Sequence, residues 1–254
     1  MPNIKLEIEY DGSNYRGWQV QNSPRSTVPI SPQRKTIQET IEKALQKILQ
    51  EKIKLIASGR TDAGVHAQAQ VANLKTTKRI PLEKLQQALN ALLPDDIAIT
   101  KVLEVSPDFH ARFAAKSKIY RYTILNRPYR SARLKDRAYF YPYPLNIKLM
   151  QKEAGCLLGR HDFTSFQASG SSCKQAIRRI KKIKVGRHRD LINIDIEADG
   201  FLYNMVRNIV GTLIEIGRGR FLKGSLKRIL SLKNRKFAGP TAPPEGLCLV
   251  RVKY

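Results

Sequence analysis

The feature that most constrains the fold is a repeated change of hydrophobic period along the chain. Every second residue from Ile4 to Tyr10 is apolar and the residues between are charged, which is typical of a half-buried strand. A helix is expected to begin at Thr36, because Glu39 completes a capping box and an apolar face continues to Leu49. Strand-like and helix-like segments continue to alternate along the chain up to the C-terminus.

The other expected elements follow from the same two periods. Helices are expected from Pro81 to just before Pro94, and at 146–159 and 204–216. Strands are expected where apolar residues alternate or cluster, at 53–57, 68–75, 97–105, 118–125, 137–142, 191–197 and 247–254. Segment 177–185 fits a strand only ambiguously, because its apolar residues are spaced three apart. Residues 22–35, rich in Ser, Pro and Arg, indicate an exposed loop.

Each half of the chain therefore places several strands alongside two helices, with long returns between strands. This order predicts an α+β fold, in which helices cover a largely antiparallel sheet. We expect two α/β halves, residues 1–105 and residues 106–254, which share one continuous sheet with a cleft between them. No repeat of individual residues supports a duplication of the halves.

An excess of positive charge is the main information in the composition. The chain has 46 Lys and Arg against 21 Asp and Glu, and a formal net charge of +25. Such a surface attracts polyanions and repels itself. A nucleic-acid-binding surface is therefore favoured over a merely solvated one. The densest basic stretch runs from Arg178 to Arg189, and we expect it to follow a nucleic-acid backbone.

The sequence does not indicate a metalloprotein, a disulfide-bonded protein or a membrane protein. Cys156, Cys173 and Cys248 are far apart and predict neither a disulfide framework nor a zinc site. The 4 histidines lack the spacing of a metal site. The N-terminus is unlike a signal peptide, and no apolar run has the length of a membrane span. We therefore expect a cytoplasmic protein without membrane contact.

The segment Gly59-Arg60-Thr61-Asp62-Ala63-Gly64-Val65-His66 is the chemically most informative part of the chain. Two glycines allow the backbone to turn tightly, and a cation and an anion lie two residues apart between two expected strands. From the residues alone two interpretations stay open: a β-turn with a surface contact between Arg60 and Asp62, or a catalytic turn. The positive charge of the chain favours the second interpretation.

The longer string from Ala57 to Ala67 resembles the catalytic motif of the tRNA pseudouridine synthases of the TruA type. The resemblance extends over nearly the whole chain, in the same order. Its further motifs are Tyr10-Asp11-Gly12, Gly17-Trp18-Gln19, Phe109-His110-Ala111-Arg112-Phe113, Tyr120-Arg121-Tyr122, Asp162-Phe163-Thr164-Ser165-Phe166, Met205-Val206-Arg207-Asn208-Ile209-Val210-Gly211 and Glu245-Gly246-Leu247. Residues 22–35 depart from the family, because this connection is longer than expected.

The resemblance implies a fold and a reaction. The fold is the pseudouridine synthase fold, in which two ferredoxin-like halves form a continuous sheet with helices on one side and a central basic cleft. The reaction takes a flipped uridine of tRNA, breaks the bond between N1 and C1′, and joins C5 to C1′. The resemblance further implies a homodimer that acts without cofactor or metal on positions 38, 39 and 40 of the anticodon arm, in tRNA numbering.

The resemblance also implies roles for single residues in catalysis. Asp62 is implied as the catalytic carboxylate, acting as a nucleophile at C1′ or C6 or as a base that removes a sugar proton. Arg207 is implied as the partner that keeps Asp62 ionised, although an exposed helix arginine is the better interpretation without the resemblance. Arg60 is implied to enter the space left by the flipped nucleotide, to contact a phosphate, or both.

The remaining implied residues bind the substrate. Tyr120 is implied to stack on the target uracil and to retain the detached ring. A core aromatic is the alternative role, and it fits Tyr122 better than Tyr120. Arg112, Lys116 and Lys118 are expected to extend the basic surface towards the active site.

Two functions of other classes compete with isomerisation. A non-catalytic RNA-binding protein would use the same basic surface to recognise folded RNA by its shape and phosphates. A glycoside-cleaving enzyme would need a second carboxylate, and the sequence offers no convincing partner beside the turn. Release of free uracil would support this second rival, whereas conversion without a change of mass would count against it.

Overall fold

The computed structural model describes residues 1–19, 35–170 and 175–254. The loop expected at 22–35 therefore lies, except for Lys35, outside the described residues, and so does Cys173. The chain forms two compact units. The first unit contains Met1–Lys116 and Leu249–Tyr254, and the second contains Ser117–Cys248.

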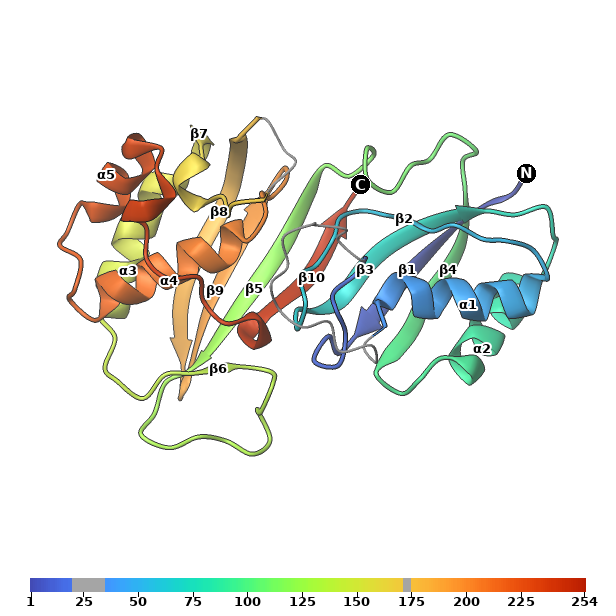
Figure 1. The fold of residues 1–254 in the computed structure, drawn as a ribbon, viewed down its shortest axis with the longest axis horizontal. Helices are drawn as coiled ribbons and strands as arrows, with labels where there is room; N and C mark the ends of the chain where they lie inside the picture. Colours follow the sequence, from blue (N-terminus) through green and yellow to red (C-terminus); the bar gives the residue numbers. More distant parts are fainter. Residues whose placement is uncertain (20–34, 171–174) are drawn as a thin grey trace. The chain divides into compact units, whose positions relative to one another are not determined.

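The first unit has three long antiparallel strands in the order β4-β1-β3. These are β1 (Asn3–Tyr10), β3 (His66–Lys75) and β4 (Ile97–Val105), and the short β2 (Ile56–Ala57) pairs with β3. Two helices, α1 (Ile37–Leu49) and α2 (Leu82–Leu92), cover one face of these strands (Figure 1). Leu6 and Ile8 of β1 are fully buried, as the alternation of this strand predicts.

The N-terminal cap of α1 also brings the preceding chain into place. The Thr36 side chain accepts a hydrogen bond from the Glu39 amide at 3.2 Å, which confirms Thr36 as the cap. In the first turn of the helix, the Ile37 amide donates to the Gly17 carbonyl at 3.2 Å and the Gln38 amide donates to the Trp18 carbonyl at 3.0 Å. The start of α1 therefore holds the Gly17–Trp18 segment.

The second unit has four antiparallel strands in the order β5-β9-β8-β7. These are β5 (Ser117–Leu125), β7 (Gly159–Asp162), β8 (Ile177–His188) and β9 (Leu191–Ala198). The two-residue β6 (Tyr139–Phe140) runs parallel to β5. The helices of this unit are α3 (Ile147–Ala154), α4 (Met205–Gly217) and α5 (Ser225–Leu232), and α4 packs against α3 and β5.

The last strand, β10 (Leu247–Lys253), is divided between the units, since Cys248 belongs to the second and Leu249 to the first. Short 3-10 turns occur at Gly155–Leu157, Thr164–Phe166, Arg235–Phe237 and Pro244–Gly246. The predicted α+β class and the largely antiparallel pairing are confirmed. The cleft and the division after residue 105 stay predictions.

Several elements are shorter than the sequence predicts. β2 and β6 contain two residues each, where strands were expected at 53–57 and 137–142. The helix expected at 146–159 ends as an α-helix at Ala154 and continues only as a 3-10 turn. Its apolar spacing persists, because Leu157 is fully buried. Gly159 then begins β7 with φ +96, a backbone conformation that a helix does not contain.

The ambiguous segment 177–185 is a strand, and its irregular spacing has a structural cause. β8 pairs with β9 with a register shift between Ile180 and Lys182. A β-bulge of this kind inserts an extra residue, so Ile180 and Ile183 both reach the core although they are three apart. Helix α5 was not predicted, because no capping side chain marks its start: Gly224, with φ +87, precedes it instead.

Candidate active site

Asp62 lies in the connection between β2 and β3, and we call residues Ser58–His66 the Asp62 turn. At its start, the Ser58 amide donates to the Val71 carbonyl at 2.7 Å, and the Ser58 hydroxyl donates to Oε1 of Gln70 at 2.8 Å. The side-chain amide of Gln70 donates to the Gly59 carbonyl at 2.9 Å. Ser58 and Gln70 are fully buried. Strand β3 therefore holds the backbone on the N-terminal side of Asp62.

Thr61, which precedes Asp62, is held by the last residue of β1 and by the chain that follows this strand. The hydroxyls of Tyr10 and Thr61 form a hydrogen bond of 2.7 Å, and the Trp18 amide donates to the Thr61 carbonyl at 3.0 Å. Thr61 is buried, and so is Trp18, whose ring is tilted against Tyr10 with a centroid distance of 6.2 Å. The position of Asp62 thus depends on residues far away in the sequence.

Gly17 allows the two segments to approach closely. Its φ is +83, in the left-handed region that favours glycine, and a Cβ atom at this position would lie 2.4 Å from the Thr61 carbonyl oxygen. A side chain at residue 17 would therefore push on the backbone next to Asp62.

We expect Gly17→Ala to lower the free energy of unfolding by about 2–4 kcal/mol, because left-handed strain and overpacking act together. Activity should fall as well, since the Asp62 turn must shift to relieve the contact. The matched control is Gly219→Ala: φ is +81 there, but nothing lies within 4 Å of the added Cβ. Urea unfolding of both variants separates the effects, and equal losses in the two would contradict the proposed contact.

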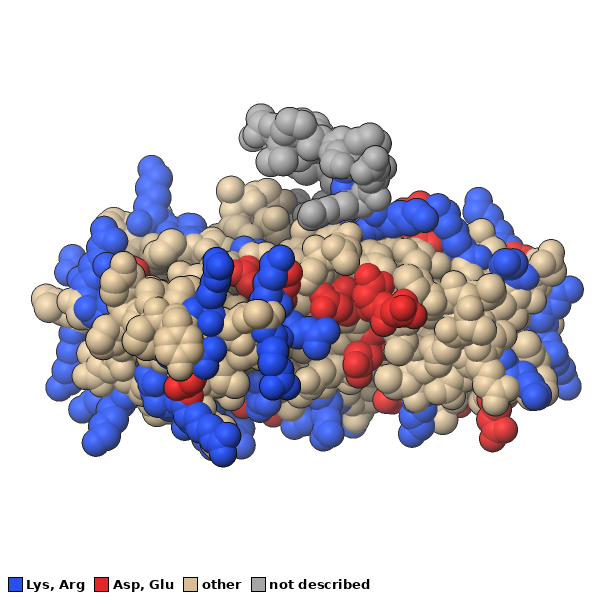
Figure 2. Space-filling model, turned by 90° about the horizontal axis from the view of Figure 1, so that it is seen from below, with Lys and Arg blue, Asp and Glu red and all other residues tan. Residues whose placement is uncertain are grey.

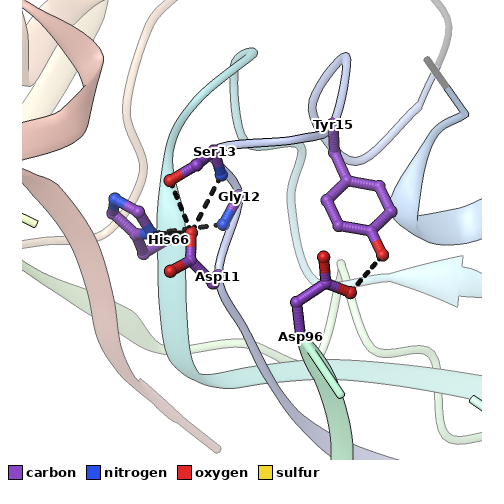
Figure 3. Close-up of polar contacts among 6 residues, drawn as sticks. All are labelled: Asp11, Gly12, Ser13, Tyr15, His66 and Asp96. Carbon is purple, nitrogen blue, oxygen red and sulfur yellow. Dashed lines mark hydrogen bonds and ion pairs between the residues drawn. The ribbon is translucent and has the colours of Figure 1, made fainter. Parts of the chain in front are cut away.

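Asp11 and His66 hold the other end of the Asp62 turn (Figure 3). The Gly12 amide donates to Nδ1 of His66 at 3.1 Å, and Oδ1 of Asp11 lies 3.2 Å from the same nitrogen. Oδ1 of Asp11 also accepts hydrogen bonds from the amide and the hydroxyl of Ser13, at 3.0 and 2.6 Å. The sequence indicates no chemical role for His66, and the structure gives this residue a positioning role.

A second polar contact holds the same loop to β4. The Tyr15 hydroxyl donates to the carboxylate of Asp96, one residue before the strand begins (Figure 3). Burial raises the pKa of the Tyr15 hydroxyl, and its hydrogen bond to Asp96 raises that pKa further. Tyr15 therefore remains protonated at neutral pH and keeps donating to Asp96.

The two candidate residues of the Asp62 turn differ in exposure. Asp62 is half-buried, whereas Arg60 is exposed. The buried residues Ser58 and Thr61 flank them and make the hydrogen bonds described above. The turn therefore presents a cation to solvent and a partly shielded carboxylate, both on a backbone that is held at several points.

The candidate substrate-binding residues Lys118 and Tyr120 lie on β5 of the second unit. The Tyr120 side chain is 8% exposed, and its ring meets Phe201 edge-on at a centroid distance of 5.1 Å. Tyr122 is fully buried and donates through its hydroxyl to the Pro243 carbonyl at 2.7 Å, as expected of a core aromatic. Tyr120 thus has a fixed ring orientation without being completely enclosed.

Arg207 lies in the first turns of α4 and is half-buried rather than exposed. Its Nε donates to the Ala242 carbonyl at 2.6 Å, and its Nη1 donates to the Asn204 side chain at 3.0 Å. In the sequence pattern, Arg207 and Gly211 lie on a different face of this helix from its apolar residues. In the structure this second face also packs against the chain, because a Cβ at Gly211 would lie 1.7 Å from the Pro240 carbonyl oxygen. α4 is therefore enclosed on both faces.

The other basic candidates lie before and at the start of β5. Arg112 and Lys116 are exposed in the connection that follows β4, and Lys118 on β5 is half-buried. The Arg112 guanidinium carbon is 5.7 Å from the ring centroid of Phe113, a side chain that is 77% exposed. An exposed aromatic ring beside a guanidinium is an arrangement on which nucleobases stack.

Residues 1–19, 35–170 and 175–254 show neither a candidate metal site nor a membrane-spanning helix. In this part of the chain, no group of three or more His, Cys, Asp and Glu side chains lies close enough to hold a metal ion. Over the same residues, no helix combines the length and the apolar character that crossing a membrane requires.

Comparison with known proteins identifies the family. A family model described as tRNA pseudouridine synthase matches residues 8–114 and 154–254. The chain is 46% identical to tRNA pseudouridine synthase A of Thermoanaerobacter sp. (strain X514) over 254 residues, which cover 100% of both chains. It is 47% identical, with the same coverage, to tRNA pseudouridine synthase A of Acetivibrio thermocellus. Its similarity to a chain in the crystal structure of a Cbf5-Nop10-Gar1 complex is weak: a TM-score of 0.38 and 12% identity, covering 97% of this chain and 58% of that one. The family match and the full-length identity show that the chain belongs to the tRNA pseudouridine synthase family.

Proposed function

We propose that this chain converts uridine to pseudouridine at positions 38, 39 and 40 of the anticodon arm of tRNA, with Asp62 as the catalytic carboxylate. The observation that carries the proposal is the Asp62 turn. Buried hydrogen bonds at Ser58 and Thr61 hold its backbone, while Asp62 itself is only half-buried. A catalytic group must be held in place before the substrate arrives, and this turn meets that requirement.

The reaction exchanges one glycosidic bond for another without a change of mass. The bond between N1 and C1′ breaks, the uracil turns, and C5 bonds to C1′. The hydrogen on C5 leaves as a proton, and N1 takes up a proton. Three first steps are open to Asp62: attack at C1′, attack at C6, or removal of a sugar proton. Each of them requires an ionised carboxylate positioned against the nucleotide.

Arg207 is assigned the role of keeping Asp62 ionised. Its guanidinium is bonded from Nε to Ala242 and from Nη1 to Asn204. These two bonds restrict the orientations of the positive charge. Such preorganisation is what makes an electrostatic partner effective, because little reorganisation is needed during the reaction.

We expect Arg207→Gln to lower kcat by about 10²-fold, because the positive charge proposed to keep Asp62 ionised is lost. Arg207→Lys keeps the charge but not the planar fork of donors, so its loss should be smaller, about tenfold. The control is Arg228→Gln, which removes an exposed charge from α5 of the same unit. Single-turnover rates decide the matter: an Arg207→Gln rate equal to that of the control would contradict the assignment.

The remaining candidates bind or extrude the nucleotide. Tyr120, with its ring held by Phe201, would stack on the uracil and retain it after detachment. Exposed Arg60 would occupy the space of the flipped nucleotide or contact a phosphate. Arg112, Lys116 and Lys118 would continue the basic surface for the RNA backbone.

The assembly is proposed to be a cytoplasmic homodimer in which one tRNA contacts both subunits. Residues 1–105 would carry the catalytic turn, and residues 106–254 would complete the active-site cleft. A monomeric mass for the active protein in solution, measured by light scattering, would contradict the dimer.

The function is tested by treating unmodified tRNA with the protein and analysing the nucleosides by mass spectrometry. We expect uridine to decrease and an isomer of equal mass to appear, and carbodiimide marking should place it at positions 38, 39 and 40. Release of free uracil would indicate glycoside cleavage instead. Binding of tRNA without any new nucleoside would indicate a non-catalytic RNA-binding protein.

A further inference from the structure

The connection between β5 and β6, residues 126–138, carries a cluster of positive charge that the catalytic assignments do not use. Its basic residues are Arg127, Arg130, Arg133, Lys135 and Arg137, and its single acidic residue is Asp136. We call this segment the β5–β6 loop. It lies between the two segments that match the family model, residues 8–114 and 154–254.

The positive charges of the β5–β6 loop, apart from that of half-buried Arg127, are exposed to solvent. Arg130, Arg133, Lys135 and Arg137 are all exposed. The loop is the yellow-green segment at the bottom of Figure 1, and Figure 2 views the molecule from that side, where Lys and Arg cover more of the visible face than Asp and Glu. A dense exposed cluster of one sign attracts a polyanion more strongly than the same charges dispersed over a surface.

Hydrogen bonds hold the start of the loop, and the pairing of β6 with β5 holds its end. At its beginning, the Asn126 side-chain amide donates to the carbonyls of Tyr141 and Tyr143, at 2.7 and 2.8 Å. The backbone amide of Asn126 also donates to the backbone carbonyl of Asp190 at 2.8 Å. Nη1 of Arg127 lies 3.2 Å from the Asp190 carboxylate. The loop therefore presents its cations from anchored ends, which lowers the entropy lost on binding.

Exposed aromatic rings accompany these cations. The Tyr129 side chain is 65% exposed, and the guanidinium carbon of Arg127 lies 4.3 Å from its ring centroid. Beyond β6, the Tyr143 side chain is also 65% exposed and meets Tyr141 edge-on at 5.7 Å. Unpaired nucleobases stack on such rings, and the guanidinium on one face of Tyr129 orients the ring for that contact.

We propose that the β5–β6 loop is a second RNA-binding surface, which contacts the phosphate backbone of tRNA through Arg130, Arg133 and Lys135 and stacks an unpaired base on Tyr129. Cations alone would suit any polyanion. The exposed tyrosines favour RNA, because an unpaired base can stack on a ring that already has a guanidinium beside it. The inference rests on the proposed function in one respect, that tRNA is the substrate.

The test uses the full-length protein with the triple substitution Arg130→Gln, Arg133→Gln and Lys135→Gln. A matched control, Lys223→Gln, Lys227→Gln and Arg228→Gln, removes three exposed cations around α5 of the same unit. Filter binding gives the Kd for tRNA over a range of salt concentrations, and steady-state kinetics give kcat and KM. Thermal unfolding checks that both variants fold.

We expect the loop variant to raise Kd and KM by about tenfold or more, and to reduce the slope of log K against log salt by up to about two. Its kcat should stay within about twofold of wild type, because no catalytic group is changed. Tyr129→Ala should weaken binding by about fivefold or more without changing the salt slope, since stacking releases no counterions. The control variant should stay within about threefold.

Equal effects of the loop variant and the control would overturn the proposal, because net charge alone would then explain them. A loop variant that binds tRNA like wild type, or a wild-type protein that does not bind tRNA, would overturn it as well. Wild-type protein that binds tRNA through the loop but forms no pseudouridine would instead contradict the proposed function and leave the loop assignment intact.

Discussion

Asp62→Asn is expected to abolish uridine isomerisation while leaving the fold and the affinity for tRNA nearly unchanged. Asparagine has almost the same shape as aspartate, but it provides neither a nucleophile nor a base. The bonds that hold the Asp62 turn come mainly from Ser58 and Thr61, so the turn should persist in the variant. Removing a central catalytic carboxylate lowers kcat by roughly 10⁴-fold or more.

Single-turnover formation of pseudouridine, measured by nucleoside mass spectrometry, checks this expectation. Asp95→Asn is the matched control, because it makes the same chemical change at an exposed carboxylate of the same unit. The control should retain wild-type activity. An Asp62→Asn protein with more than about a tenth of the wild-type rate would show that another group performs the first step.

Gly211→Ala is expected to have the largest effect on stability. The added Cβ would lie 1.7 Å from the Pro240 carbonyl oxygen, which is backbone and cannot swing away. Two hydrogen bonds join Arg207 to Ala242, which lies two residues after Pro240. The Arg207 carbonyl accepts from the Ala242 amide at 3.1 Å, and Nε of Arg207 donates to the Ala242 carbonyl. We expect the free energy of unfolding to fall by at least about 3 kcal/mol. Activity should fall too, because Arg207 would lose its anchor.

The control for Gly211→Ala is the same substitution at Gly155. This glycine has ordinary helical angles at the end of α3, and nothing lies within 4 Å of an added Cβ. Alanine restricts the unfolded chain more than glycine does, so Gly155→Ala should raise the free energy of unfolding, by up to about 1 kcal/mol. Urea unfolding of both variants tests the pair, and a Gly211→Ala protein as stable as wild type would rule out the close packing of α4.

Local patterns were sufficient for much of the fold. The strand β1 and the capped helix α1 were predictable because alternation and a capping box involve neighbours in sequence. The sequence signal was ambiguous or missing in two places. The bulge in β8 is set by pairing with β9, and α5 begins at Gly224 without a capping side chain, so nothing local marks its start.

For the candidate site, too, local sequence was sufficient for some features and insufficient for others. Its chemical groups, Asp62 with Arg60 and then Arg207 and Tyr120, could be named from sequence because motifs preserve residue types. What holds the Asp62 turn could not be named. The bonds from Tyr10 to Thr61 and from Gly12 to His66 join residues 51 and 54 positions apart.

The sequence by itself thus determined which groups are available and which local elements carry them. Only the tertiary structure decided how the Asp62 turn is held. Pairing of β1 with β3 places Tyr10 opposite Ala67, and this register brings the Asp11–Gly12 turn against His66. The physical reason is that a strand register depends on the burial of side chains along two whole strands. The motif around Asp62 contains only a few neighbouring residues and carries no information about that pairing.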